Sequence, residues 1–118
     1  LCISSICGLE VINSAPLTYS ASKAALMSYI KGASRPLGRL GVRINAIAPG
    51  NILFEGSIWN KKMKTDPKGT NEFIKKEVAL GKFGSTEDVA HLSTFLVSPL
   101  AKFITGSIYT VDGGQVRS

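Results

Sequence analysis

The chain has 118 residues, of which 44% are hydrophobic, and 14 Lys and Arg against 8 Asp and Glu give it a formal net charge of +6. This length suits one domain, and no apolar run approaches the ~20 residues of a membrane-spanning helix. Cys2 and Cys7 show no metal-ligand spacing, and the lone His91 accompanies no cluster of metal ligands. We therefore expect no metal site and no contact with a membrane. We also expect reduced, buried thiols in a cytoplasmic protein.

Residues 1–5 form a short apolar segment that predicts a β-strand, and Gly8 provides a break soon after it. Two hydroxyl side chains, Ser4 and Ser5, lie at the carboxyl end of this segment. Alternation along a strand sends them to opposite sides, so they compete for any role in a site. Ligands of open α/β sheets bind outside the carboxyl ends of the strands, which is where such a hydroxyl would act.

A helix is predicted over residues 17–39, and it carries Tyr19 and Lys23 four positions apart. Residues i and i+4 share one face of a helix, so the phenol and the ammonium can point into the same site. A nearby cation favours the deprotonated phenol and brings it into the range of general acid/base catalysis. The pair therefore suggests proton transfer, although a solvated helix face with one Tyr and one Lys is the simpler explanation of these two residues alone.

The same helix has apolar residues at helical spacing, typical of a packed core or a subunit interface. Proline at position 36 removes a backbone hydrogen bond and clashes with the preceding turn, so we expect a kink or an early end there. The apolar positions are Ala25, Leu26, Tyr29, Ile30, Ala33 and Leu37.

Residues 42–48 predict a second strand, which ends at Pro49-Gly50 and completes a strand–helix–strand unit. A helix is expected near residues 71–79, and another from Thr86, whose hydroxyl would cap it, to about Val97. Residues 108–111 predict the last strand. Asp112 and the two glycines after it then form a turn, in which we expect Asp112 to be structural.

Five segments in this order and spacing resemble the short-chain dehydrogenases/reductases, and the resemblance covers the whole chain. They are Ile3-Ser4-Ser5-Ile6-Cys7-Gly8, Tyr19-Ser20-Ala21-Ser22-Lys23-Ala24-Ala25, Val42-Arg43-Ile44-Asn45-Ala46-Ile47-Ala48-Pro49-Gly50, Gly84-Ser85-Thr86-Glu87-Asp88-Val89-Ala90, and Thr105-Gly106 followed by Val111-Asp112-Gly113-Gly114.

The resemblance implies a doubly wound parallel sheet (Rossmann-like), here its carboxyl-terminal portion with about three strands and flanking helices. It implies an oxidoreductase that interconverts a small-molecule carbonyl and an alcohol with NAD or NADP, working as a homo-oligomer through the first helix. Tyr19 would exchange the proton and Ser5, three residues before Gly8, would orient the substrate oxygen. Lys23 would tune Tyr19 and hold the cofactor ribose. The nicotinamide pocket would be lined by Tyr19, Lys23, Pro49, Gly50 and the backbone of Ile52.

No glycine-rich turn between a strand and a helix is present to cradle a pyrophosphate. We therefore expect residues 1–118 to be the carboxyl-terminal catalytic part of a single Rossmann-like oxidoreductase domain, with the amino-terminal cofactor-binding half absent. Such a piece should be inactive alone, and its three strands should leave an edge and apolar surface open to association.

Residues 51–70 lie where the resemblance places a mobile substrate lid, and loops of this kind carry specificity. Phe54 stands where many members of the family have a threonine that contacts the nicotinamide amide, and the sequence leaves open whether Ser57 replaces it. Phe54 and Trp59 are equally compatible with a wall of the substrate site and with a cover over the core.

Two other functions compete with the oxidoreductase. The first is a catalytically silent fragment or pseudoenzyme that acts through association. The second is a basic nucleic-acid-binding module that uses the lysines at 61, 62, 64, 75 and 76, but interspersed acids and the lack of a reader motif disfavour it. A solvated helix face explains these lysines more simply. A milder alternative is that the basic segment attracts an anionic substrate or the cofactor phosphate.

Overall fold

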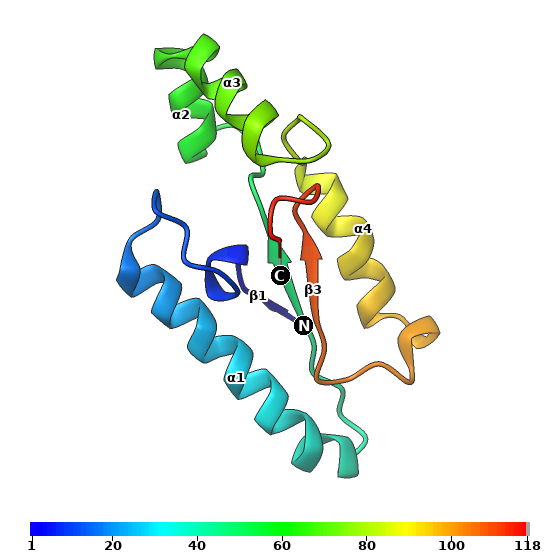
Figure 1. The fold of residues 1–118 in the computed structure, drawn as a ribbon. Coiled ribbons are helices and arrows are strands. Elements are labelled where there is room, and N and C mark those ends of the chain that lie inside the picture. Colours follow the sequence, from blue (N-terminus) through cyan, green and yellow to red (C-terminus); the bar gives the residue numbers. More distant parts are fainter. Residues whose placement is uncertain (118) are drawn as a thin grey trace.

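The computed structural model of the protein describes residues 1–117 and contains a parallel sheet flanked by helices (Figure 1). In chain order the elements are β1 (Cys2–Ile3), the 3-10 turn η1 (Ile6–Gly8), α1 (Leu17–Arg39), β2 (Ala46–Pro49), α2 (Ile58–Thr65), α3 (Pro67–Glu77), α4 (Thr86–Val97), the 3-10 turn η2 (Pro99–Ala101) and β3 (Ile108–Val111).

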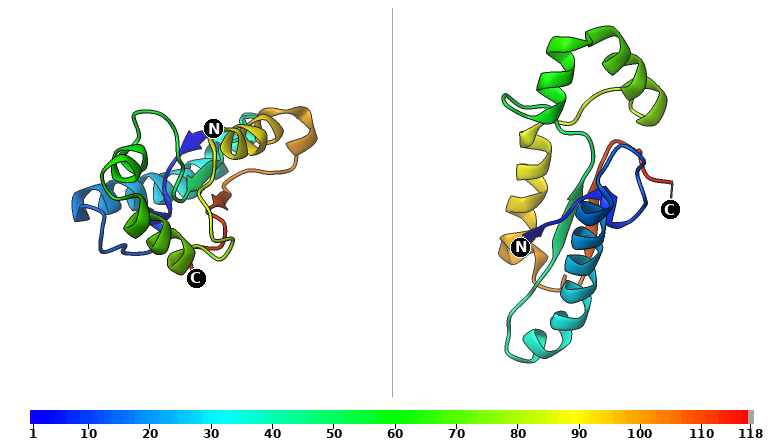
Figure 2. Two further views of the ribbon diagram at one scale, coloured as in Figure 1. Left: turned by 90° about the horizontal axis from the view of Figure 1, so that it is seen from above. Right: turned by 90° about the vertical axis from the view of Figure 1, so that its left-hand side faces the viewer.

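The three strands are ordered β1-β2-β3 and all pair in parallel, with Cys2 opposite Ala46 and Ala46 opposite Ile108. Figures 1 and 2 show α1 and α4 on opposite sides of these strands. The central strand is covered most completely, since Ala46, Ile47 and Ala48 are each 0% exposed. This is the expected outcome for a parallel strand whose two faces are both covered.

The first two strands differ in length from the sequence prediction, whereas the third matches it. The ladder of β1 ends early because the Ser5 hydroxyl accepts a hydrogen bond from the Cys7 amide (3.2 Å), which turns the chain into η1. β2 begins only at Ala46 because the Asn45 side chain, and not its backbone, makes the hydrogen bonds toward the segment before β3. Its amide donates to the Ile104 carbonyl (2.9 Å) and accepts from the Ser107 amide (3.0 Å).

α1 spans the predicted residues. Of the two outcomes expected at Pro36, a kink or an early end, the early end is wrong, because the helix continues to Arg39. Proline removes only its own backbone bond, and a strong stop follows three residues later. The amides of Leu40 and Val42 both donate to the Leu37 carbonyl, and Gly41 takes the left-handed conformation with φ +76°.

The buried face of α1 consists of Ser20, Met27 and Ile30. Tyr29, which the predicted apolar stripe included, is 65% exposed and points away from the sheet side of the helix. Leu17, at the start of the helix, is 73% exposed. α1 therefore carries large apolar side chains that the rest of the described chain leaves exposed.

α2 and α3 form a hairpin beyond the carboxyl end of β2, at the top of Figure 1, and they replace the loop predicted over residues 51–70. Ser57 caps α2 through the Asn60 amide (3.0 Å), and Asp66 caps α3 through the Gly69 amide (3.0 Å). The second cap and Pro67 in the first turn start α3 four residues before the predicted residue 71.

α4 runs over the predicted residues, but its cap is Ser85 rather than Thr86. The Ser85 hydroxyl accepts from the Asp88 amide (3.2 Å) while the Asp88 carboxylate accepts from the Ser85 amide (2.8 Å), which is a capping box. The thiols of Cys2 and Cys7 are free, and they are half-buried rather than buried because β1 is an edge strand and η1 borders a cavity.

Candidate active site

Ser5 is held at the carboxyl end of β1, where it starts the turn η1. This turn packs directly on α1 at Gly8. A Cβ atom at Gly8 would lie 2.8 Å from the Lys23 carbonyl carbon and 2.9 Å from the Ala24 nitrogen. Only glycine permits this approach of two backbones, which fixes the distance between the Ser5 turn and the helix.

Tyr19 and Lys23 lie one turn apart near the start of α1, as the sequence predicts. The Lys23 ammonium donates to the Ile3 carbonyl (3.1 Å) and lies 5.6 Å from the centre of the Tyr19 ring. The Tyr19 side chain is 42% exposed. The anchored ammonium thus lies beside a phenol that solvent or a ligand can reach.

The two serines of the first strand have different partners. The Ser4 hydroxyl donates to the Lys23 carbonyl (3.2 Å), so it ties the strand to α1. The Ser5 hydroxyl accepts from the Cys7 amide and keeps its own hydrogen for another acceptor. Ser5 borders both cavities described below, whereas Ser4 borders only the larger one.

At the carboxyl end of β2, Gly50 lies against the turn that follows β3. Its amide donates to the Val111 carbonyl (3.0 Å), and a Cβ atom there would lie 2.8 Å from the Asp112 Cβ. The Asp112 carboxylate accepts from the amides of Gly114 (3.0 Å) and Val116 (2.9 Å). This arrangement agrees with the structural role predicted for Asp112, and Gly113 and Gly114 both have positive φ.

One cavity of about 450 Å³ contains all six residues that the sequence selected. It opens at the carboxyl ends of β1 and β2, between α1 and the segment after β2. The six are Ser5, Tyr19, Lys23, Pro49, Gly50 and Ile52.

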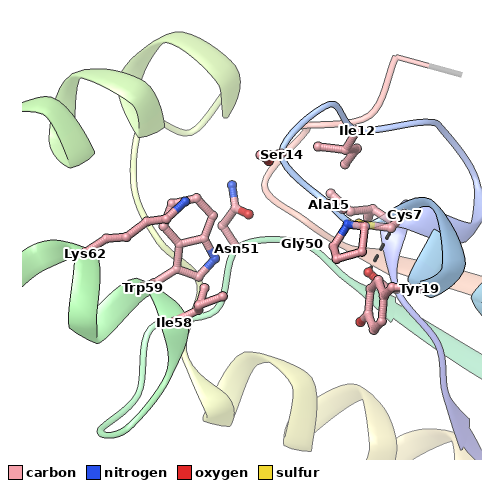
Figure 3. A pocket seen from close by; sticks show the side chains of 13 residues that line it. Cys7, Ile12, Ser14, Ala15, Tyr19, Gly50, Asn51, Ile58, Trp59 and Lys62 are labelled. Carbon is pink, nitrogen blue, oxygen red and sulfur yellow. Dashed lines mark hydrogen bonds between the residues drawn. The ribbon is translucent and has the colours of Figure 1, made fainter.

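A second cavity of about 350 Å³ adjoins the first and shares Ser5, Tyr19 and Gly50 with it (Figure 3). Figure 3 shows Ile58, Trp59 and Lys62 of α2 on one side of this space and Tyr19 on the other. The remaining wall comes from Asn51 after β2, from η1 and from the loop before α1. The residues of η1 and of this loop that line the cavity are Ile6, Cys7, Ile12, Ser14, Ala15 and Pro16.

Sequence reasoning did not select most of these second-cavity residues. Trp59 was predicted as a possible wall of the substrate site, but Lys62 was considered only together with the other lysines, whose simplest explanation was a solvated helix face. Once α2 is known, the positions i and i+3 place Trp59 and Lys62 on one face. No local pattern marks the loop residues before α1, whose position depends on the packing of η1 on that helix.

Phe54 and Ser57 both border the larger cavity. Phe54 is 51% exposed. The Ser57 hydroxyl accepts from the Asn60 amide, and more weakly from the Phe54 amide (3.4 Å), so in this structure it serves as the cap of α2. Phe54 has no hydroxyl, whereas the Ser57 hydroxyl accepts these bonds and keeps its own hydrogen for another acceptor.

Two carboxyl groups at the start of α4, near Thr86 in the wall of the larger cavity, have lowered pKa values. The pKa of Asp88 is lowered mainly by the Ser85 amide and also by the Ser85 hydroxyl. The pKa of Glu87 is lowered by a backbone hydrogen bond and by the Thr86 hydroxyl. Both groups are fully exposed, Asp88 belongs to the capping box of α4, and neither borders the two cavities described above.

Within residues 1–117, no group of three or more His, Cys, Asp or Glu side chains is placed to hold a metal ion. Among the helices of the same residues, none combines the length and the hydropathy required to span a bilayer.

Comparison with known proteins agrees with this geometry. The family model described as Enoyl-(Acyl carrier protein) reductase matches residues 1–115. The fold is the Rossmann-like fold of the short-chain oxidoreductases, and the chain belongs to the short-chain dehydrogenase/reductase family.

Two curated relatives show how far the similarity extends. Isoepoxydon dehydrogenase patN of Aspergillus clavatus is 40% identical over 111 residues, which are 94% of this chain and 42% of that protein. Human 3-oxoacyl-[acyl-carrier-protein] reductase is 37% identical over 112 residues, which are 95% of this chain and 42% of that protein. The chain thus spans less than half the length of these relatives.

Solved structures give the same result. A 4-hydroxyisoleucine dehydrogenase complexed with NADH matches with a TM-score of 0.85 and 32% identity, over 98% of this chain and 46% of that one. YwfH, an NADPH dependent reductase involved in bacilysin biosynthesis, matches with a TM-score of 0.87 and 30% identity, over 98% and 46%.

Proposed function

We propose that the whole protein containing this chain is an NAD(P)-dependent oxidoreductase that interconverts a carbonyl and an alcohol. The proposal rests on one observation: a single cavity is lined by Ser5, Tyr19, Lys23, Pro49, Gly50 and Ile52. That cavity lies at the carboxyl ends of parallel strands, where ligands of α/β sheets bind.

The residues present fit the nicotinamide end of such a cofactor. The Lys23 ammonium has three hydrogens and gives one to the Ile3 carbonyl, which leaves donors for the ribose hydroxyls. Pro49 and Ile52 provide apolar contacts in the same cavity. When bound, the cofactor supplies or accepts a hydride; NADH and NADPH both occur among the structural relatives, and we leave the choice between them open.

In the proposed reaction, side chains of this chain orient the substrate oxygen and transfer its proton. The Ser5 hydroxyl donates to the substrate oxygen and orients it. Tyr19 gives its proton to that oxygen during reduction and takes it back during oxidation. Lys23, held by the Ile3 carbonyl, places its ammonium 5.6 Å from the centre of the Tyr19 ring.

The decisive experiment is Tyr19→Phe in the protein at its natural length. We expect turnover, followed by nicotinamide absorbance, to fall about 10²–10⁴-fold, because the general acid is lost. The melting temperature should stay the same because this side chain is 42% exposed.

Tyr29→Phe is the matched control, since Tyr29 lies on the same helix and borders neither cavity. It should leave turnover unchanged. If Tyr19→Phe also left turnover unchanged, Tyr19 would have no part in the mechanism. Absence of turnover in the unaltered protein at its natural length would instead favour the silent, associating protein.

We also propose that the enzyme forms a homo-oligomer. This association accompanies catalysis and is not an alternative to it. Leu17 and Tyr29 of α1 are 73% and 65% exposed, which supports a homo-oligomer interface on this helix. Residues 1–118 contain no glycine-rich turn for a pyrophosphate, so we expect no turnover from this chain alone. We further propose a cytoplasmic location, consistent with two free cysteines.

A further inference from the structure

The second cavity has an apolar body with one charged end. Its walls include Ile12, Pro16, Ile58 and Trp59, and among the described residues that line it Lys62 carries the only charge. Tyr19 lies on the opposite side of the cavity from Lys62 (Figure 3). A ligand that reaches both groups therefore needs an apolar middle.

The Lys62 ammonium has no anionic partner in the part of the chain that the structure describes. The ion pair found there within 4.0 Å joins Lys76 to Glu77, and no carboxylate lies that close to Lys62. Instead its ammonium lies 4.5 Å from the centre of the Trp59 ring. This cation–π contact holds the charge at the cavity wall without neutralising it.

Asn51 provides a second polar group in the same wall. Its Nδ2 atom is buried and has no hydrogen-bond acceptor among residues 1–117. Figure 3 places the Asn51 amide between the indole of Trp59 and the loop that carries Ser14. A buried donor without a partner costs free energy, and an acceptor brought by a ligand would remove that cost.

Given the proposed oxidoreductase function, we propose that the substrate is a carboxylic acid whose apolar body separates the carboxylate from the reacting carbonyl or alcohol. Lys62 and Asn51 bind the carboxylate, while Ser5 and Tyr19 hold the reacting oxygen. A single cation lines the cavity among the described residues, which matches a singly charged carboxylate better than a doubly charged phosphate.

The test compares each oxo acid with its uncharged methyl ester, using the protein at its natural length. Levulinate and its longer straight-chain homologues serve as the acids. We expect Lys62→Met to lower the ratio of kcat/KM for acid over ester about tenfold, because a charge-assisted hydrogen bond is lost, and to leave the ester values unchanged. Asn51→Asp, which has the same size but adds a negative charge, should lower the same ratio.

Lys64→Met is the matched control, because Lys64 lies on the same helix, carries the same charge and borders neither cavity. It should not change the ratio. A second readout is independent of turnover: hexanoate should bind more tightly than hexanamide by isothermal titration, and Lys62→Met should remove the difference.

These two readouts separate the failure of this inference from the failure of the proposed function. An unchanged acid preference and unchanged hexanoate affinity in Lys62→Met overturn the carboxylate site, even if Tyr19→Phe abolishes turnover. Full turnover in Tyr19→Phe overturns the proposed mechanism, while the hexanoate titration still decides the role of Lys62. Failure of the unaltered protein to distinguish hexanoate from hexanamide overturns the inference as well.

Discussion

The two walls of the candidate site are built differently. The wall with Ser5, Tyr19 and Lys23 rests on backbone packing: η1 meets α1 at Gly8, and the adjacent strand β2 is fully buried over residues 46–48. The wall with Trp59 and Lys62 belongs to the α2–α3 hairpin. In α2 no residue is buried, and in α3 the buried residues are Thr70 and Ile74.

Aromatic contacts of Trp59 join the two helices of the hairpin to each other and to the loop before α4. The Trp59 ring stacks on Phe73 of α3 at 5.5 Å, and it meets Phe83 of the loop before α4 at 5.4 Å. This difference indicates that the core fixes the positions of the proton-transfer groups. The substrate-facing groups lie on a hairpin whose conformation or sequence can change without disturbing the core.

The largest effect should come from the rigid wall. Gly8→Ala places a methyl group against the backbone of Lys23 and Ala24, which cannot rotate out of the way. We expect a loss of about 1–3 kcal/mol in the free energy of unfolding, as in other overpacked sites, together with loss of turnover. Denaturant unfolding of the natural-length protein measures the first, and nicotinamide absorbance the second.

Gly32→Ala is the control for that change, because a Cβ atom at Gly32 meets nothing within 4 Å. It should stabilise the protein by roughly 0.8–1.0 kcal/mol, since alanine is the better residue inside a helix. If the two alanine variants changed stability alike, the close contact between η1 and α1 would not be what holds the rigid wall.

A smaller effect is expected in the adjustable wall. Trp59→Leu removes both aromatic contacts, each worth about 0.5–1.5 kcal/mol beyond burial. Hydrogen exchange should then quicken in residues 58–77 while β2 keeps its protection. Phe103→Leu, at a side chain that is 100% exposed, should change neither. Equal loss of protection in β2 and the hairpin would show that the two walls unfold as one unit.

The smallest effect concerns the capping box of α4. Hydrogen bonds from Ser85 lower the pKa of Asp88 in the folded state, so the unfolded state binds a proton first on acidification. The resulting stabilisation is complete above the usual aspartate pKa of about 3.9 and is lost as pH falls through the lowered folded value. Melting temperatures measured from neutral pH downward should therefore fall less steeply in Asp88→Asn than in the unaltered protein. A parallel decline in both would contradict the capping role.

Sequence reasoning predicted most of the fold but not the second cavity. The helices over residues 17–39 and 86–97 and the strand over residues 108–111 follow from periodicity and local caps. The predictions failed where a side chain replaced the regular backbone ladder, as at Ser5 and Asn45, and where short polar helices carried no apolar stripe, as in α2.

The sequence by itself determined the family and the choice of Ser5, Tyr19, Lys23, Pro49, Gly50 and Ile52. All but Ile52 lie in short segments with specific order and spacing, and Ile52 follows one of these segments by two residues. Only the tertiary structure decided that all six share one cavity and that Lys62, without an anionic partner among the described residues, lies opposite Tyr19 in the next one. The physical reason is that spacing along a chain is local, whereas a cavity is made by segments that meet only when η1, α1, β2 and α2 pack together.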